Sequence, residues 1–220
     1  MYSLKTSNIS RSFSEILKKI KTKGIMHYSK LVFQVLRRSL QPRWQRLFIF
    51  ESLLEGIVPN EYNSTIEVKM LWEINEQLCS FANQRGAWYL QQAKDLLLKG
   101  NICFVTVIDS KITSCLWTSF NLVYLPDIEY KLIVAKDIAP LIDGYTLDEY
   151  RGNGLYKIIW NECFNYLVKS GKYSKIYGFI NHDNKRSLLV HDKLNLNKII
   201  FYITLIKFLG IRVHLKRKIK

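Results

Sequence analysis

Residues 146–156 read TLDEYRGNGLY, and this stretch determines the predicted fold. The apolar run Leu141–Leu147 predicts a strand, and a pattern of apolar residues every three or four positions after the stretch predicts a helix. A glycine-rich turn between a strand and a helix exposes backbone N–H groups at the helix N-terminus, where the helix dipole favours negative charge. Gly152 and Gly154 lack a Cβ, so a phosphate can approach the backbone.

This turn is predicted to bind a phosphate, and Arg151 adds a charge-assisted contact. No Gly-Lys-Ser/Thr follows, so the turn is not a P-loop, and the GxGxxG spacing is absent as well. The alternative is an ordinary strand-to-helix turn that contains a glycine pair.

Outward from the turn, hydrophobic patterns predict an α/β domain with a mixed sheet. Asp109-Ser110-Lys111 predicts a hairpin turn, and the strand-helix-strand unit at residues 141–181 predicts a parallel crossover. The expected strands are 65–71, 102–108, 112–120, 130–135, 141–147, 175–181, 198–208 and 211–215, and the expected helices are 72–100, 154–170 and 184–194.

Residues 1–60 are predicted to form an extension to a domain at 61–220. Within the extension, Ser14–Leu40 predicts one or two basic amphipathic helices, which dock on a membrane or partner or else pack across their own domain. Arg46–Leu53 predicts a short strand that joins the extension to the body.

The positive charge of the chain lies at its two ends. The net charge is +10 for residues 1–46, +6 for residues 207–220 and −1 for the residues between them. Such ends suit an anionic membrane surface, an acidic protein or nucleic acid. Because a DNA-binding domain more often carries its charge on the folded body, nucleic acid is the least favoured of these partners.

The four cysteines are spread along the chain without a CxxC pair or metal-ligand spacing, which predicts free thiols in a reducing cytosol and no metal site. No apolar run approaches the ~18 residues that span a bilayer. Residues 1–12 lack the apolar stretch of a secretory signal. We therefore expect a cytoplasmic protein, at most peripheral at the inner membrane face.

Two segments resemble the GNAT superfamily of N-acetyltransferases. The family's CoA loop follows the pattern Arg/Gln-x-x-Gly-x-Gly/Ala, which DEYRGNGLY matches with Arg151 and Gly154, while Tyr156 stands where glycine or alanine is usual. The second segment, residues 184–196, resembles the family's Asn-x-x-Ala/Ser helix, and His191 occupies the position of a frequent tyrosine. The resemblance covers roughly residues 65–215. It implies a GNAT-like, mainly antiparallel twisted sheet with a central parallel strand-helix-strand unit.

The resemblance also implies a reaction, in which acetyl-CoA or another acyl-CoA gives its acyl group to a primary amine without a metal. It implies pantetheine binding along residues 143–147 and a backbone N–H near Tyr145 or Thr146 that stabilises the oxyanion. The implied CoA contacts are Thr146, Arg151, Gly152, Asn153, Gly154, Leu155, Tyr156 and Asn184.

For proton transfer, position implies His191 as the acid that protonates the CoA thiolate, provided that a neighbour raises its pKa above the usual value of about 6.5. Tyr145 and Tyr202 are alternative donors. Asp143 or a water relay is the candidate base, although Asp143 is equally suited to brace a strand bend.

The acceptor is implied more loosely. Trp117, Phe120 and Tyr124 are either the lining of an acceptor pocket or ordinary core. A looser resemblance to GNAT-like proteins associated with bacterial surface-polysaccharide synthesis implies an amino sugar.

Two alternatives stay open. One is an N-acyl amino acid synthase that takes acyl chains from an acidic acyl carrier protein docked on the basic N-terminal helices. The other is a catalytically degenerate GNAT-fold module that binds at a membrane surface, which the residues at positions 156 and 191 favour.

Overall fold

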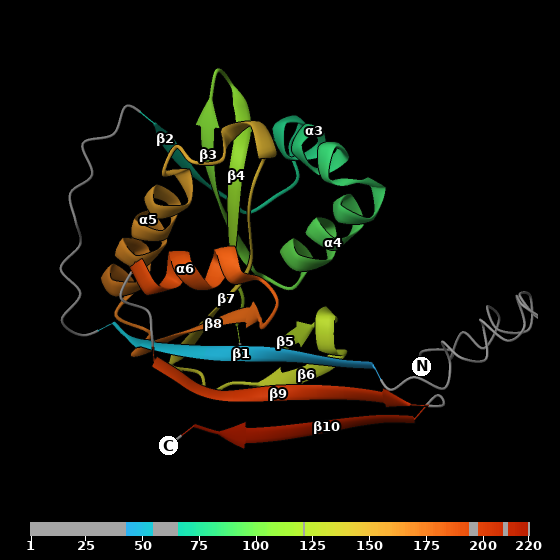
Figure 1. Ribbon diagram of the computed structural model, residues 1–220. Coiled ribbons are helices and arrows are strands. Elements are labelled where there is room, and N and C mark those ends of the chain that lie inside the picture. The colour runs from blue at the N-terminus through green and yellow to red at the C-terminus, as the bar shows by residue number, and fades with distance from the viewer. Residues whose placement is uncertain (1–42, 55–65, 121, 194–197, 209–210, 220) are drawn as a thin grey trace, which may run out of the picture. The chain divides into compact units, whose positions relative to one another are not determined.

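The computed structural model describes residues 43–54, 66–120, 122–193, 198–208 and 211–219 of the 220-residue chain (Figure 1). The helices expected at 14–40 lie outside the described residues. The elements follow in the order β1 (Arg43–Leu53), β2 (Glu67–Leu71), α3 (Glu76–Arg85), α4 (Ala87–Leu98), β3 (Ile102–Ile108), β4 (Lys111–Thr118), β5 (Leu122–Leu125), β6 (Tyr130–Ile133), β7 (Ile138–Thr146), α5 (Leu155–Ser170), β8 (Lys175–Asn181), α6 (Lys185–Lys193), β9 (Lys198–Phe208) and β10 (Ile211–Lys218). Two short 3₁₀ helices lie at Pro126–Ile128 and Asp148–Tyr150.

The chain divides into two compact units, residues 1–44 with 206–213 and residues 45–205 with 214–220. The described part of the first unit consists of the ends of strands β1, β9 and β10. Helices α3 to α6 and the site described below belong to the second unit. The domain boundary near residue 60 stays a prediction. Strand β1 precedes that boundary in the chain and pairs with β8.

The main sheet has the strand order β10-β9-β1-β8-β7-β4-β3-β2. Strands β7 and β8 are parallel, and the pairs β1–β8, β4–β7, β3–β4 and β2–β3 are antiparallel. Strands β5 and β6 form a separate antiparallel hairpin. This arrangement confirms the predicted mixed, mainly antiparallel sheet with a central parallel strand-helix-strand unit.

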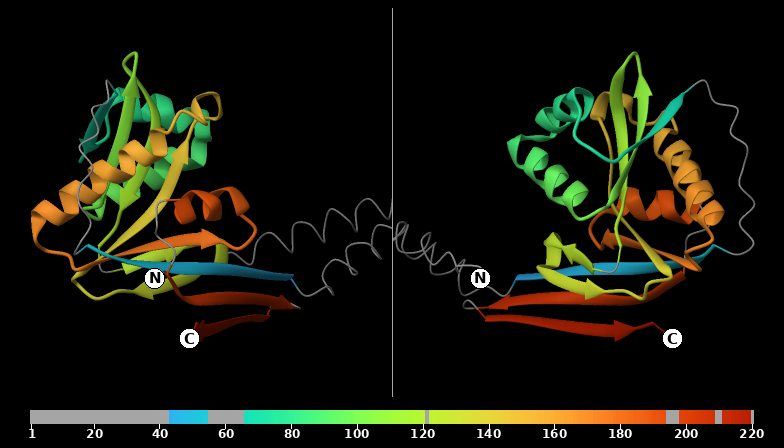
Figure 2. Two further views of the ribbon diagram at one scale, coloured as in Figure 1. Left: turned by 60° about the vertical axis from the view of Figure 1, so that its left-hand side comes forward. Right: turned by 180° about the vertical axis from the view of Figure 1, so that it is seen from behind.

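Helix α5 covers one face of the sheet. Its residues Ile159 and Cys163 pack in one core with Leu116 of β4 and Leu141 of β7. Because side chains alternate between the two faces of a strand, the neighbours of Leu116 point the other way. Figures 1 and 2 show α5 on the opposite side of β3 and β4 from α3 and α4.

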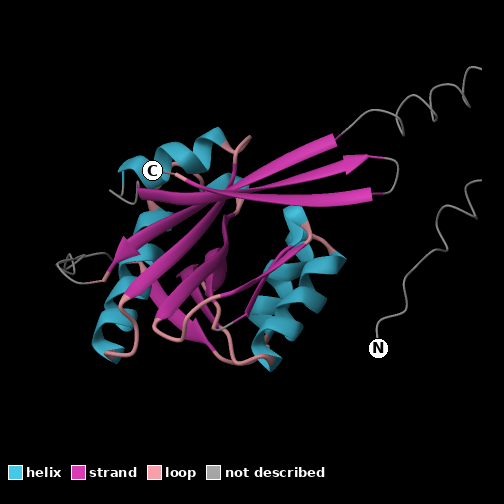
Figure 3. Ribbon diagram, turned by 90° about the horizontal axis from the view of Figure 1, so that it is seen from below, coloured by secondary structure: helices cyan, strands magenta, loops and turns pink. Residues whose placement is uncertain are grey.

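Helices α3 and α4 cover the second face, where Phe81 and Tyr89 pack with Cys115 and Trp117 of β4. The β5–β6 hairpin packs on the same face, because Ile142 of β7 contacts both the α3–α4 core and the hairpin core. Seen from below, the strands run between two groups of helices (Figure 3). The two faces of the sheet thus carry separate cores.

Two expectations about elements need correction. The stretch 72–100 was expected as one helix but forms α3 and α4, because Gly86 has φ 115°, a conformation outside the helix that glycine adopts without a Cβ clash. Residues 122–125 form strand β5, although the sequence predicts no strand between 120 and 130. The hairpin turn is confirmed, since Asp109 and Ser110 both have positive φ, at 48° and 62°.

The described cysteines are all free thiols, and Cys103, Cys115 and Cys163 are buried. None of the described helices is both long and apolar enough to cross a membrane.

Candidate functional site

The site begins where strands β7 and β8 separate. Their parallel pairing ends at Leu141 and Gly178, although β7 continues to Thr146 and β8 to Asn181. Beyond the last pair, β7 remains paired with β4 and β8 remains paired with β1. Each strand therefore follows its outer neighbour, and the sheet opens between them.

A β-bulge lies at this opening. Two residues of β7, Asp143 and Gly144, face the single residue Leu116 of β4. Asp143 has φ 48°, in the left-handed region that few non-glycine residues occupy. The bulge bends β7 at the point where it leaves β8.

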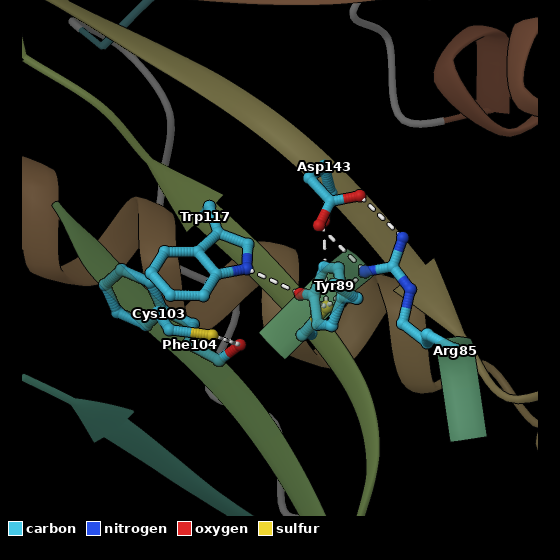
Figure 4. Close-up of polar contacts among 7 residues, drawn as sticks. Arg85, Tyr89, Cys103, Phe104, Trp117 and Asp143 are labelled. Atoms are coloured by element: carbon cyan, nitrogen blue, oxygen red, sulfur yellow. Dashed lines mark hydrogen bonds and ion pairs between the residues drawn. The ribbon is translucent and has the colours of Figure 1, made fainter. Parts of the chain in front are cut away.

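Arg85, the last residue of α3, clamps the bulge (Figure 4). Its Nη1 and Nη2 donate to the two carboxylate oxygens of Asp143, each at 2.8 Å. The guanidinium lies 3.7 Å from the ring centroid of Tyr89 and 4.2 Å from that of Tyr145. Trp117 Nε1 in turn donates to the Tyr89 hydroxyl at 2.9 Å. The bulge is thus fixed by a fork-shaped ion pair between aromatic rings.

The Arg85–Asp143 pair is largely withdrawn from water, with 8% and 19% of the two side chains exposed. Burial by itself lowers the pKa of Arg85, but the hydrogen-bonded Asp143 carboxylate outweighs burial and raises it. Asp143, the candidate base, therefore lines the site with both oxygens engaged by a permanent cation.

A pocket of about 570 Å³ occupies the opening between the strands. Asp143 of β7 and Gly178 of β8 line it. Trp88 of α4 lines it from the face that α3 and α4 cover, and Trp160 of α5 lines it from the opposite face. The pocket therefore extends through the sheet from one face to the other.

His191 of α6 lines the pocket on the α5 side and is 4% exposed. Its Nδ1 lies 2.9 Å from the Ser187 carbonyl oxygen. Because a carbonyl only accepts, Nδ1 carries the proton. Burial lowers the pKa of His191, so the ring is neutral at pH 7 and Nε2 has no proton. The shift is opposite to the raised pKa that an acid role for His191 requires.

Tyr156 lies beside His191 in the pocket, with ring centroids 6.1 Å apart. Its ring packs on Gly144: a Cβ at that glycine would lie 2.6 Å from Cε2 and 2.8 Å from the phenol oxygen. Only glycine fits there. Burial raises the pKa of Tyr156. The unusual tyrosine of the glycine-rich turn thus reaches from α5 to the bulge.

Trp160 completes this group of aromatic residues. Its ring centroid lies 5.7 Å from that of His191 and 6.3 Å from that of Tyr156. The side chain is 3% exposed, and its Nε1 lies near enough to the Tyr156 hydroxyl to lower the pKa of that phenol against the larger effect of burial, but it forms no hydrogen bond of normal geometry with any described residue. A buried N–H without a partner costs free energy, which a bound acceptor atom would recover.

The glycine-rich turn leads into α5. Gly152 and Gly154 have φ 87° and 72°, and a Cβ at either position would meet nothing within 4 Å. The first turn of α5 has no side-chain cap and no acidic residue, so its N-terminal N–H groups suit an anion. Arg151 is held within the turn by two contacts. Its Nη2 lies 2.6 Å from Asp148 Oδ1, and its Nε donates to the Thr146 carbonyl oxygen at 3.1 Å.

Other residues expected to contact CoA have structural partners. Asn184 lines the pocket and caps α6, since its Oδ1 accepts from Ser187 N at 3.1 Å. Thr146 Oγ1 donates to Ser114 Oγ at 3.2 Å. Asn153 Nδ2 donates to the Tyr150 carbonyl at 3.3 Å, within the same turn. Leu155 is 2% exposed and belongs to the core.

The alternative proton donors lie elsewhere. Tyr145 packs under Arg85, and its hydroxyl donates to Asp148 at 3.5 Å. Tyr202 packs against Arg46, at 4.6 Å from ring centroid to guanidinium carbon. Neither tyrosine lines the pocket. Among the described residues, no three His, Cys, Asp or Glu side chains are grouped to hold a metal ion.

Of the three aromatic residues considered for an acceptor pocket, only Tyr124 lines it. Trp117 is fully buried, and Phe120 stacks on Tyr173. Sequence reasoning missed Arg85 and Trp160. No local pattern in the sequence marks Arg85 or distinguishes Trp160 from the other apolar residues of its helix. Gly144 carried a usable signal, because a glycine inside a strand often marks a bulge or a close approach.

No family model matches the sequence, and no curated protein matches it. Solved structures are similar to it at low identity. The aminoglycoside acetyltransferase AAC(6')-Iy, in complex with a bisubstrate analogue of CoA and acetylneamine, is 14% identical with a TM-score of 0.48, over 62% of this chain and 93% of that one. The aminoglycoside 6'-N-acetyltransferase AAC(6')-IG from Acinetobacter haemolyticus is 15% identical with a TM-score of 0.46, over 60% and 92%.

A third solved structure, described as a GNAT-family acetyltransferase from Novosphingobium aromaticivorans, is 15% identical with a TM-score of 0.49, over 74% of this chain and 63% of that one. All three of these neighbours are described as acetyltransferases, and the third is described as a member of the GNAT family.

Proposed function

We propose that the chain transfers an acyl group from acyl-CoA to a primary amine. The observation that carries this proposal is the pocket that crosses the sheet between β7 and β8. Such an opening lets two substrates approach from opposite faces and meet beside the bulge. Holding two reactants in this way lowers the entropic cost of their reaction.

The donor side is the face that α5 covers. Acyl-CoA carries a pyrophosphate, and the uncapped N-terminus of α5 behind Gly152 and Gly154 suits that group. The pantetheine arm carries amide groups, which suit the free edge of β7 beyond Leu141 and the unpartnered N–H of Trp160. The residues present therefore fit CoA on the donor side.

The acceptor side is the face with α4 and the β5–β6 hairpin. Trp88 and Tyr124 are 60% and 53% exposed there and line the pocket, together with the carboxylate of Asp127. Aromatic faces and a carboxylate attract an ammonium group. This lining supports an amine acceptor, and an amino sugar is the specific acceptor that we propose.

In the proposed reaction, the neutral amine nitrogen attacks the thioester carbonyl carbon. Negative charge develops on the carbonyl oxygen, and a backbone N–H at the bulge stabilises it. The Arg85–Asp143 pair contributes by fixing the bulge, because misplacement of a reacting group by 1 Å is costly.

The first experiment is calorimetric titration of acetyl-CoA into the wild type, Gly154→Glu and Gly171→Glu. Both glycines have left-handed φ and open space at Cβ, at opposite ends of α5. We expect Gly154→Glu to weaken binding at least tenfold, or about 1.4 kcal/mol, because its carboxylate repels the pyrophosphate. Gly171→Glu is the matched control and should bind like the wild type.

Other outcomes decide between the alternatives. Wild type that binds no acetyl-CoA but accepts acyl chains from acyl carrier protein would favour the N-acyl amino acid synthase. Binding of acetyl-CoA without acyl transfer to glucosamine, neamine or spermidine would favour the degenerate module. A cytoplasmic location stays a prediction that rests on the cysteine spacing and on the polar residues 1–12, and docking at the inner membrane face stays a prediction that rests on the charged ends.

A further inference from the structure

In the proposed reaction, no residue has yet been assigned to give a proton to the leaving sulfur. When the carbon–sulfur bond breaks, the sulfur leaves as a thiolate and takes up a proton. The side chains that line the pocket on its α5–α6 face and carry an N–H or O–H hydrogen are those of Tyr156, Trp160, Asn184, Ser187 and His191.

His191 is not suited to donate that proton. The hydrogen of its neutral ring is on Nδ1 and is used in the bond to the Ser187 carbonyl. Its Nε2 lies 3.7 Å from the Cβ position of Gly178, which also lines the pocket, and this nitrogen is an acceptor. The residue at the position of the family's frequent tyrosine therefore presents a lone pair.

The other groups differ in acidity. An indole N–H, an amide N–H and an aliphatic hydroxyl are much weaker acids than a phenol, whose ordinary pKa is about 10. Because the neutral ring of His191 holds only the N–H that it donates to the Ser187 carbonyl, Tyr156 carries the most acidic hydrogen among the described residues that line the α5–α6 side.

The phenol of Tyr156 lies beside the bulge, where the proposed reaction takes place. Its phenol oxygen lies 2.8 Å from the Cβ position of Gly144, one residue beyond the bulge residue Asp143. We infer that Tyr156 is the proton donor to the leaving thiolate, which moves this role from α6 to the first turn of α5. This inference rests on the proposed acyl transfer.

The amine nitrogen forms a bond to the carbonyl carbon, and the carbon–sulfur bond breaks with its electron pair on sulfur. The phenol O–H gives its proton to sulfur, and the proton that the amine nitrogen loses returns to the phenolate through water. Burial raises the pKa of the phenol, so it holds its proton between turnovers. The same burial makes a thiolate more basic.

The test compares the wild type with Tyr156→Phe, which keeps the ring on Gly144 and removes the hydroxyl. Tyr166→Phe is the matched control, because Tyr166 lies on the same helix and packs on Phe104 outside the pocket. Thiol release is followed with whichever of glucosamine, neamine and spermidine the wild type acetylates fastest. We expect Tyr156→Phe to lower kcat by ~10²–10⁴-fold with an unchanged KM for acetyl-CoA, and Tyr166→Phe to match the wild type.

A second donor separates proton donation from a structural role. In the selenoester analogue of acetyl-CoA the leaving group is a selenolate, which is less basic and leaves without protonation. We expect the kcat deficit of Tyr156→Phe to be much smaller with this donor. Equal deficits with both donors, an unchanged kcat or a loss of acetyl-CoA binding would each overturn the inference. A wild type that acetylates none of the three amines would instead remove the proposed function, and the inference with it.

Discussion

The two faces of the sheet at the opening between β7 and β8 differ in how their polar groups are satisfied. On the α3–α4 face, Arg85 and Asp143 satisfy one another, and Trp117 donates to Tyr89. On the α5–α6 face, Trp160 Nε1 has no partner among the described residues, and the neutral ring of His191 presents Nε2 as an acceptor. Groups with complete bonding rigidify a structure, whereas incompletely bonded groups in a pocket are available to a ligand. The first face therefore supports the bulge, and the second is the face on which we propose that the donor binds.

The variant Arg85→Met tests the supporting role of the first face most directly. It leaves the Asp143 carboxylate without its counter-ion in a largely buried position. We expect a loss of about 3–5 kcal/mol in the free energy of unfolding, measured by urea denaturation. The double variant Arg85→Met/Asp143→Asn should recover much of it, because no buried charge remains.

An exposed ion pair gives the control for this variant. Lys69 Nζ lies 3.2 Å from Glu67 Oε2, and 40% and 58% of the two side chains are exposed. Lys69→Met should therefore change stability by less than about 1 kcal/mol. If Arg85→Met were as mild as Lys69→Met, the ion pair would have no supporting role at the bulge.

A smaller effect is expected from the glycines on the two separated strands. A Cβ at Gly144 would lie 2.6 Å from the Tyr156 ring, whereas a Cβ at Gly178 would lie 3.7 Å from His191 Nε2, an ordinary contact. Gly144→Ala should cost ~1–3 kcal/mol through overpacking, and Gly178→Ala much less. Thermal unfolding of both variants measures the difference. Equal costs would show that the Tyr156 ring yields freely.

The smallest effect concerns pH. Burial lowers the pKa of His191, so below the unfolded pKa of about 6.5 the unfolded chain binds more protons than the folded one. The contribution of neutral His191 is complete above that pH and is lost as the pH falls toward the folded pKa. Wild type should therefore lose more stability than His191→Phe between neutral pH and about pH 5. The free energy of unfolding of both proteins is measured by urea denaturation at the two pH values. An equal loss in the two proteins would contradict this expectation.

Local signals were enough to predict the glycine-rich turn and most of the strands. Strands β3, β8 and β9 begin and end where their apolar patterns predicted, since a short pattern between turn residues determines them. Gly154 and Gly171 likewise bound α5 as expected. These features depend on residues that are neighbours in the chain.

The supporting face was not predictable in the same way. Arg85 and Asp143 are separated by 58 positions, and nothing near either residue indicates the other. The predicted acid role of His191 required a raised pKa, but the sign of the shift depends on how deeply α6 packs on Trp160 and Phe50. Long-range packing of this kind leaves no periodic pattern in the sequence.

The pairing of β1 with β8 bears on how the chain is made. Leu53 pairs with Lys175, and Phe50 pairs with Gly178 at the wall of the pocket. Translation proceeds at ~5–20 residues per second, so an early strand waits roughly 6–25 s for its neighbour to leave the ribosome. During that interval the apolar segment Leu47–Phe50 has an unpaired edge, which invites aggregation. Yield in fast expression hosts is therefore expected to depend on chaperones that shield this nascent strand.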